Sequence, residues 1–202
     1  MVDKYGVGQD PYCYPNSGVL RNLLNIQDEE QLQKAERELS EIAVSNFRLL
    51  PPPYDLNLLQ HIHKTLFADV YEWAGLRRTV NNRKDDTLFC AAERIDPEAG
   101  KIFKIMERAS WFVGTNKAEL VKNIAESYGD LNVVHPFREG NGRAQRILFE
   151  QIIINAGFAV DWWLIKDAAW VPANIAAVAC DYRGLEAIFE HCIGDPLNAP
   201  LS

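Results

Sequence analysis

Residues 135–146 read His-Pro-Phe-Arg-Glu-Gly-Asn-Gly-Arg-Ala-Gln-Arg and lie between two segments with helical periodicity. Gly140 and Gly142 flank Asn141, and glycine readily adopts the positive φ angles that turn successive N–H groups toward one point. Such a turn forms an anion-binding nest, and the helix that starts there adds the positive end of its dipole. The stretch therefore predicts a phosphate-binding loop between two helices.

Two arginines and one glutamate surround this loop. Arg143 and Arg146 lie three residues apart on one face of the following helix, in a first turn where the helix dipole disfavours a cation. Guanidinium groups bind phosphate oxygens through paired hydrogen bonds, so the two arginines favour more than one phosphate group. Glu139 would repel phosphate unless a divalent cation bridged the two, and Mg²⁺ is commonly held by one or two carboxylates with substrate phosphates. We expect Glu139 to hold that metal.

His135 and Phe137 have different expected roles. Pro136 biases His135 toward an extended conformation at the end of the preceding helix, with its side chain free to reach over the same cavity. A histidine there can take a proton from an attacking hydroxyl, a step worth typically about 10² to 10⁴ in rate. Phe137 is expected to anchor the loop in the core. Taken singly, each of these features is more often structural than functional, and it is their combination that favours a functional site.

The rest of the chain is dominated by helical periodicity, with aspartates and glycines as start and stop signals. The predicted helices run from Asp28 to the prolines at 51–53, from Asp55 onward, from Asp96 to Gly114, from Thr115 to about Val134, from Gly142 to Gly157, from about Asp167 to Cys180 and from Tyr182 to Cys192. Residues 147–154 are apolar almost all round, which predicts that their helix lies at the centre of a bundle. The fold class is therefore all-α.

One segment interrupts this pattern. Residues 77–80 and 87–90 are two short β-prone arms around the polar turn 81–86, which predicts a β-hairpin. An isolated hairpin among helices has unpaired strand edges that can accept an extended peptide by strand addition. A solvated connecting loop is the alternative interpretation.

Composition limits the classes of function. The 202 residues are 48% hydrophobic and 24% charged, as in an ordinary globular protein, and we expect a single domain over 1–202. The 21 basic and 28 acidic residues give a net charge of −7, the wrong sign for a chain held to nucleic acid by its overall field. The four cysteines lack metal or redox spacing, and no apolar run is long enough to cross a membrane. We expect a cytoplasmic protein that binds neither membrane nor nucleic acid directly.

Two other groups of residues carry little functional signal. His61 and His63 are two residues apart on a predicted helix and cannot share a metal, so one is expected to pack and the other to face solvent. The tryptophans at 162, 163 and 170 could form an exposed patch for a partner, but core packing is favoured.

Residues 135–146 match H-x-F-x-[D/E]-G-N-G-R-x-x-R at every specified position, and by this motif the chain resembles the Fic (filamentation induced by cAMP) family. Residues 67–75, Phe-Ala-Asp-Val-Tyr-Glu-Trp-Ala-Gly, are similar to the family's lead-in to its hairpin "flap". Residues 5–25 are similar to the same stretch of short bacterial Fic toxins. The resemblance covers most of the chain and is strongest from about 60 to 160. It implies a Fic fold, a helical bundle with one β-hairpin flap and with N-terminal and C-terminal helical extensions.

The resemblance also implies an activity, protein adenylyltransfer, in which AMP passes from ATP to a hydroxyl of a target protein with Mg²⁺ present. His135 is then the general base and Glu139 the Mg²⁺ ligand. The phosphates are cradled by Gly140, Asn141, Gly142 and Arg143, and Arg146 binds the terminal phosphate. An extended segment of the target would dock on the flap, at Thr79, Val80, Asn81, Thr87 and Leu88.

Several alternatives to this activity stay open. Asn141 and Arg143 separate the loop from the Doc branch of the superfamily, whose altered nest is associated with phosphorylation. Family members that transfer phosphocholine or UMP leave the identity of the donor open, and such sites can also remove AMP. A nucleotide-binding regulatory module with little turnover belongs to a different class, and the intact His135, Glu139 and Arg146 argue against it.

Many Fic proteins are restrained by a helix that carries [S/T]-x-x-x-E-[G/N]. This chain has no full match, because its nearest candidate, Thr115 to Glu119, is followed by Leu120. We therefore expect restraint from a small separate antitoxin with an inhibitory helix, as in the toxin–antitoxin members. The resemblance to short toxins implies type II topoisomerases, DNA gyrase and topoisomerase IV, as targets.

Overall fold

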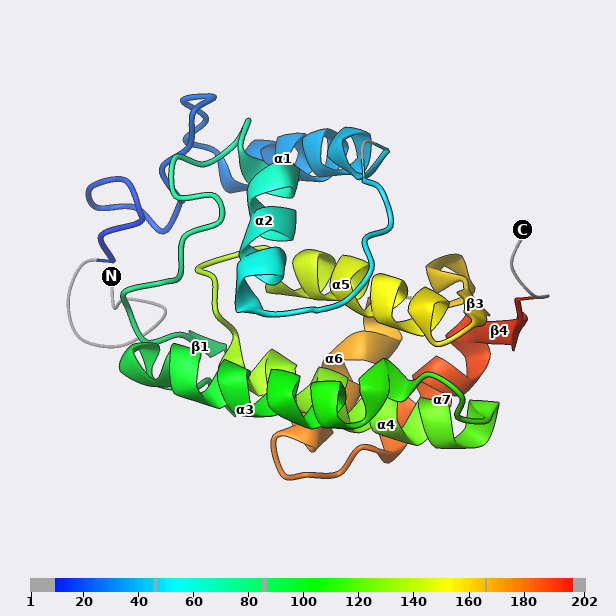
Figure 1. Cartoon of the computed structure of the whole chain (residues 1–202). Helices are drawn as coiled ribbons and strands as arrows, with labels where there is room; N and C mark the ends of the chain where they lie inside the picture. The colour runs from blue at the N-terminus through cyan, green and yellow to red at the C-terminus, as the bar shows by residue number, and fades with distance from the viewer. Residues whose placement is uncertain (1–9, 46, 85–86, 166, 198–202) are drawn as a thin grey trace.

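The computed structural model of the chain describes residues 10–45, 47–84, 87–165 and 167–197. In these ranges the chain forms seven α-helices, three 3₁₀ turns and two small antiparallel sheets (Figure 1). The helices are α1 (Glu29–Val44), α2 (Leu56–Phe67), α3 (Ile95–Arg108), α4 (Lys117–Val134), α5 (Asn141–Asn155), α6 (Asp167–Ala177) and α7 (Arg183–Cys192). The strands are β1 (Arg83–Lys84), β2 (Thr87–Leu88), β3 (Phe158–Val160) and β4 (Ile193–Pro196), and the 3₁₀ turns are Ala92–Arg94, Ser110–Phe112 and Trp162–Leu164. The predicted helical bundle with a hairpin is confirmed.

Helices α4 and α5 form the centre of the bundle. Helix α4 packs against α3, α5, α6 and α7, while α5 packs on its other side against α2, on which α1 lies (Figure 1). Five side chains of α5 are buried completely, in agreement with the apolar sequence of this helix: Ala144, Leu148, Phe149, Ile152 and Ile153. Residues 135–140 join the two central helices, so both ends of the predicted phosphate loop are fixed in the core.

Two of the three aspartates predicted to cap the start of a helix do so, and the third does not. Asp28 accepts a hydrogen bond from the N–H of Gln31 at 2.9 Å, and Asp55 accepts one from Leu58 at 2.8 Å, so both are N-caps as predicted. Asp96 is not a cap, because the chain is already helical from Ile95 onward and the aspartate lies in the first turn.

Two helices differ from the predicted pattern. Helix α3 ends at Arg108, before Gly114, because a 3₁₀ turn takes the chain out of the helix axis. In α1, Ile42 is 65% exposed, whereas Glu36 and Ser40 are buried. The inner face of α1 is therefore partly polar.

The first strand of the hairpin lies later in the chain than the sequence predicts, whereas the second lies within the predicted arm 87–90. Strand β1 pairs with β2 in the register Arg83↔Leu88 and Lys84↔Thr87, whereas the first arm is predicted at 77–80. That prediction is wrong because Arg78 is buried and its guanidinium donates to backbone carbonyls, which holds this segment against the core. The predicted flap residues Thr79, Val80 and Asn81 consequently precede the strands, while Thr87 and Leu88 form β2. Asp85 and Asp86 of the predicted turn lie outside the described residues.

A second antiparallel sheet, β3–β4, is absent from the prediction. It joins the segment after α5 to the end of α7, with Phe158 opposite Pro196 and Val160 opposite Ile193. Strands of three and four residues are too short to show a reliable alternation of apolar and polar residues.

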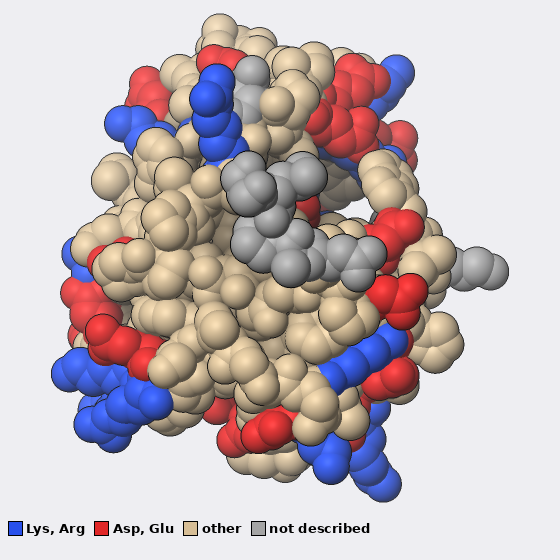
Figure 2. Space-filling model, turned by 45° about the vertical axis from the view of Figure 1, so that its right-hand side comes forward, with Lys and Arg blue, Asp and Glu red and all other residues tan. Residues whose placement is uncertain are grey.

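The surface carries both signs of charge. In the face shown in Figure 2, Lys and Arg side chains alternate with Asp and Glu side chains around a largely uncharged centre. Among the described residues that this view shows, the basic side chains are interspersed with acidic ones and form no broad continuous area. Within the described ranges, none of the helices has both the length and the apolar character needed to span a bilayer.

Candidate active site

His135 ends α4 in a left-handed conformation, with φ 49° and ψ 62°, rather than in the predicted extended one, and its N–H closes the helix on the carbonyl of Leu131. The side-chain Nδ1 lies 3.2 Å from the carbonyl oxygen of Asn132. Because a carbonyl only accepts, Nδ1 carries the proton and Nε2 keeps a lone pair. The ring stacks on Phe89, and burial lowers the pKa of His135 to about 4. At neutral pH this histidine is uncharged and has a free acceptor nitrogen, as a general base requires.

The loop enters α5 through Gly140, which has a φ of +79° and occupies the N-cap position. A Cβ at this position would lie 2.4 Å from the ring of Phe67, so only glycine fits. At Gly142 the opposite holds, because nothing lies within 4 Å of where a Cβ would be. The N–H groups of this first helical turn have no partner within the helix. The open space beside Gly142 therefore lets a phosphate approach free backbone donors at a helix N-terminus.

The side chain of Asn141 holds the loop in shape. Its Oδ1 accepts from the N–H of Phe137 and its Nδ2 donates to the carbonyl of the same residue, both at 2.8 Å. Phe137 is fully buried, as predicted for an anchor. The side chain of Asn141 thus fixes the shape of the loop, and its backbone N–H lies in the first turn of α5.

Glu139 lies at the exposed edge of the loop, where its Oε1 accepts from the N–H of Gly140 at 2.9 Å. Among the described residues, no group of three or more His, Cys, Asp or Glu side chains is placed to hold a metal ion. A single carboxylate fits Mg²⁺, which commonly takes one or two carboxylates and completes its shell with water and substrate phosphates.

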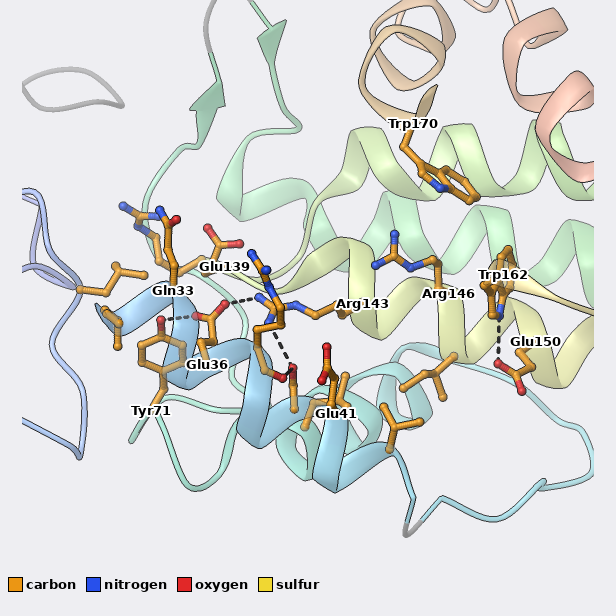
Figure 3. Close-up of a pocket in the computed structure, with 18 of the residues that line it drawn as sticks. Gln33, Glu36, Glu41, Tyr71, Glu139, Arg143, Arg146, Glu150, Trp162 and Trp170 are labelled. Carbon is orange, nitrogen blue, oxygen red and sulfur yellow. Dashed lines mark hydrogen bonds and ion pairs between the residues drawn. The ribbon is translucent and has the colours of Figure 1, made fainter. Parts of the chain in front are cut away.

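The two arginines have different surroundings (Figure 3). Arg143 is paired with Glu36 of α1, and its guanidinium lies 4.7 Å from the ring centre of Phe67. Arg146 points toward Trp170, with 5.8 Å between its guanidinium carbon and the ring centre. Within the described part of the chain Arg146 has no ion pair. Arg146 is therefore the arginine whose charge is available to an anion.

Two adjoining cavities meet at the loop. One, of about 270 Å³, contains His135 and Gly142, and the other, of about 1050 Å³, lies between α1 and α5 and contains Arg143. Four residues line both cavities: Arg138, Glu139, Arg146 and Trp170. An elongated ligand can therefore lie with one end at His135 and the other end between the two helices.

Arg78 is a site residue that the sequence analysis missed. It is 2% exposed and donates from Nε to the carbonyl of His135 at 2.7 Å. Its other donors bind the carbonyls of Val80, Cys90 and Val134. In the sequence, Arg77 and Arg78 fall in the first predicted β-prone arm, and nothing local indicates that one of them is buried.

Two further side chains hold the middle of the loop. Asn82 donates from Nδ2 to the carbonyls of Phe137 and Arg138, both at 3.3 Å. Arg138 forms a buried ion pair with Asp10 at 2.6 Å, which ties the N-terminal segment to the loop. These partners are far apart in the sequence, so no spacing could have indicated them.

His63 supports the loop from beneath. It is fully buried and stacks on Phe137, with 3.9 Å between ring centres. Its Nδ1 accepts from the N–H of Gly75 at 2.9 Å, so the proton lies on Nε2, which is 2.9 Å from the carbonyl oxygen of Glu139 and donates to it. His61 is exposed, so the expectation that one of these histidines packs and the other faces solvent is confirmed.

The three tryptophans do not share one environment. Trp170 is buried, as favoured by the sequence analysis, and Trp162 donates to Glu150 at 2.9 Å. Trp163 is 93% exposed, contrary to core packing, because the 3₁₀ turn Trp162–Leu164 directs neighbouring side chains to different sides.

The sequence pattern of the Fic/DOC family matches residues 53–153. Over 195 residues the chain is 37% identical to the probable protein adenylyltransferase Fic of Escherichia coli (strain K12), covering 96% of this chain and 98% of that protein. It is also 37% identical over 176 residues to protein adenylyltransferase VbhT of Bartonella schoenbuchensis, covering 85% of this chain and 36% of VbhT.

Solved structures show the same arrangement of elements. The BepC protein of Bartonella tribocorum, crystallised with bound AMPPNP, superposes with a TM-score of 0.84 at 27% identity, over 93% of this chain and 97% of that chain. The N-terminal Fic domain of a Bartonella quintana effector with bound ADP also gives a TM-score of 0.84, at 29% identity, over 93% and 95% of the two chains.

The burial of His63 predicts a pH-dependent stability. Burial lowers the pKa of His63 to about 4, so between pH 6.5 and pH 4 the unfolded chain binds a proton that the folded chain does not. We expect the free energy of unfolding to be highest above pH 6.5 and to fall as the pH drops toward 4, by about 3 kcal/mol from this residue. His135 adds to the slope in the same direction.

Denaturant unfolding at pH 7 and pH 5 measures this effect. His63→Phe keeps an aromatic ring in place but cannot titrate, so its stability should depend less on pH than that of the wild type. His61→Phe, on the exposed side of the same helix, is the matched control and should keep the wild-type dependence. The assignment is wrong if His63→Phe and the wild type lose the same stability between the two pH values.

Proposed function

Because the chain belongs to the Fic/DOC family and is a protein adenylyltransferase, we propose that it transfers AMP from Mg²⁺-bound ATP to a hydroxyl of a bacterial type II topoisomerase. The observation that carries the proposal is the placement of a neutral His135, with Nε2 free, beside the open helix N-terminus at Gly142. The bound AMPPNP and ADP in the related structures support an adenine nucleotide as the donor. The four free cysteines and the use of ATP support a cytoplasmic location.

These positions support the following reaction. Nε2 of His135 takes the proton of the target hydroxyl, whose oxygen attacks the α-phosphorus of ATP. A P–O bond forms to the target as the bond to the bridging oxygen breaks, and pyrophosphate leaves. The backbone N–H groups of Asn141 and Gly142 stabilise the charge on the phosphate oxygens, and that of Gly140 would join them once Glu139, which binds it here, turns to Mg²⁺. Arg143 and Arg146 bind the leaving phosphates. Mg²⁺ held by Glu139 would neutralise phosphate charge.

Replacement of the base tests the reaction. His135→Ala should abolish transfer and leave the dissociation constant for ATP within about threefold, because it removes the proton acceptor and none of the phosphate donors. The measurements are incorporation of α-phosphate label into DNA gyrase and topoisomerase IV, mass spectrometry of a bacterial lysate for added AMP, and calorimetric ATP binding. His61→Ala is the control and should behave as wild type. Loss of ATP affinity as large as the loss of transfer would contradict the role of His135.

We also propose that the target docks on the hairpin. Strands β1 and β2 pair only with each other within the described residues, so each has a free edge for an extended peptide. Leu88 of β2 is 65% exposed, and the next residue, Phe89, stacks on His135. A segment held at β2 would therefore lie next to the base.

Leu88→Asp should raise the KM for the target protein at least about tenfold and leave ATP binding unchanged, because a charge replaces an apolar contact outside the nucleotide cavity. Leu76→Asp is the matched control, since Leu76 is 59% exposed but lies outside the hairpin. Equal losses in the two variants would mean that the hairpin is not the docking site.

Control by a partner is the last part of the proposal. We propose that the chain is the toxin of a toxin–antitoxin pair, in which a small antitoxin inserts the glutamate of an inhibitory helix beside Arg146. The unpaired state of Arg146 within the described residues and the 1050 Å³ cavity beside it support this. The glutamate would occupy the place of the terminal phosphate.

The purified chain alone should therefore transfer AMP and be toxic when expressed. In the complex, substitution of the partner's inhibitory glutamate by glycine should restore transfer without dissociating the two proteins, because one ion pair is a small part of an interface. Labelling assays and size-exclusion chromatography of both complexes measure the two effects. A folded chain that is inactive alone, whatever partner is added, would place the inhibitory element within this chain.

A further inference from the structure

A buried polar network joins α1 to the first turn of α5. Glu36 is 7% exposed and accepts hydrogen bonds from the hydroxyl of Tyr71 and from Nη2 of Arg143 (Figure 3). One turn further along α1, Ser40 is 2% exposed and its Oγ accepts from Nη1 of Arg143 at 3.2 Å. The same Oγ donates to the carbonyl of Arg37 at 3.0 Å, so the hydroxyl has both a donor and an acceptor partner. The two buried polar side chains on the inner face of α1 thus both bind Arg143.

The orientation of this arginine is fixed from three sides. Glu36 and Ser40 bind its two terminal nitrogens, and the ring of Phe67 lies 4.7 Å from its guanidinium carbon. A guanidinium has five N–H donors, of which these contacts use two. Arg143 also lines the cavity between α1 and α5, and its side chain is 27% exposed, so the guanidinium is open to a ligand in this cavity.

The pairing is expected to persist when an anion binds. If Arg143 swung away, Glu36 would be left as a buried carboxylate with only the Tyr71 hydroxyl as a partner, which is strongly unfavourable. Burial raises the pKa of Tyr71, and Glu36 raises it further, so the hydroxyl stays a donor. The positive charge of Arg143 is therefore placed before the nucleotide arrives, which is the arrangement that transition-state stabilisation requires.

We propose that Glu36 is a positioning residue that aims Arg143 at the phosphates of the nucleotide, so that α1 contributes to the orientation of the donor. The inference rests on the proposed function, because it assigns Arg143 a phosphate ligand. It assigns no contact between Glu36 and the substrate. Glu36 acts through Arg143, with Ser40 as the second support.

Glu36→Gln is the test substitution, since it keeps the shape of the side chain and removes its charge. We expect the KM and the dissociation constant for ATP to rise about tenfold while the KM for the target protein stays unchanged. In a chain that already carries Arg143→Gln, the same substitution should have no further effect on either ATP constant, because Glu36 acts through Arg143. Glu38→Gln is the matched control: Glu38 is on the same helix, exposed, and 3.9 Å from Lys34.

A purely structural role would lower the melting temperature of Glu36→Gln and leave the ATP constants of the folded variant at wild-type values, which would overturn the proposal. Tighter ATP binding would overturn it too, since Glu36 would then compete with phosphate. If Glu36→Gln does not fold, Ser40→Ala is the second test substitution. It should weaken ATP binding about threefold in the otherwise wild-type chain and have no effect in a chain that carries Arg143→Gln. ATP binding is measured without turnover, so the outcome of this test does not depend on whether the chain transfers AMP. Failure of the proposed transfer would appear instead as an inactive wild type.

Discussion

The carbonyl oxygens of the loop between α4 and α5 accept hydrogen bonds from side chains outside the loop, and the rest of the site depends on these bonds. Arg78 binds the carbonyl of His135, Asn82 that of Phe137 and His63 that of Glu139. These three bonds fix the path of the loop from the end of α4, and so fix the point at which α5 begins with the N–H groups of Asn141 and Gly142. A buried carbonyl without a partner would cost about 1–3 kcal/mol, so the loop conformation is coupled to the stability of the fold.

Some charged side chains of the site are neutralised by a buried partner, and one is open to a ligand. Arg143 and Arg138 are balanced by Glu36 and Asp10, and both of these pairs also fasten a distant segment of the chain to the loop. Arg146 has no ion pair among the described residues and lies over the face of Trp170. A site with one uncompensated arginine at a helix N-terminus attracts an anion without leaving a large unbalanced charge in the core. The neutral state of His135 fits the same arrangement, because a second cation in the loop would lie close to Arg78.

The local parts of this site could be predicted from the sequence and the distant ones could not. The nest, the fixed Phe137 and the buried helix after the loop depend on neighbours within a few residues, where glycine and apolar spacing are informative. The sequence places the first strand too early because Arg78 lies in a β-prone arm and Asn82 in the polar turn after it, and the burial of both is visible only when the loop they bind is in place. The burial of Glu36 could not be predicted for the same reason. A glutamate on an amphipathic helix is usually solvated, and its partner Arg143 lies on another helix. Sequence spacing therefore identifies the residues that would bind the ligand better than it identifies the residues that hold those ligand-binding residues in place.

The fold also places the hairpin and the larger cavity on two different sides of the loop between α4 and α5. The hairpin reaches the site through Phe89, which follows β2 and stacks on His135, so a target held there delivers its hydroxyl on the α4 side of the loop. The larger cavity lies on the other side, between α1 and α5, and Arg146 lines both cavities, so leaving phosphates bound to Arg146 would lie toward the larger one. A partner that inserts a glutamate at Arg146 would compete with the nucleotide. Inhibition of this kind does not depend on which target is bound, because it acts on the half of the reaction that every target shares.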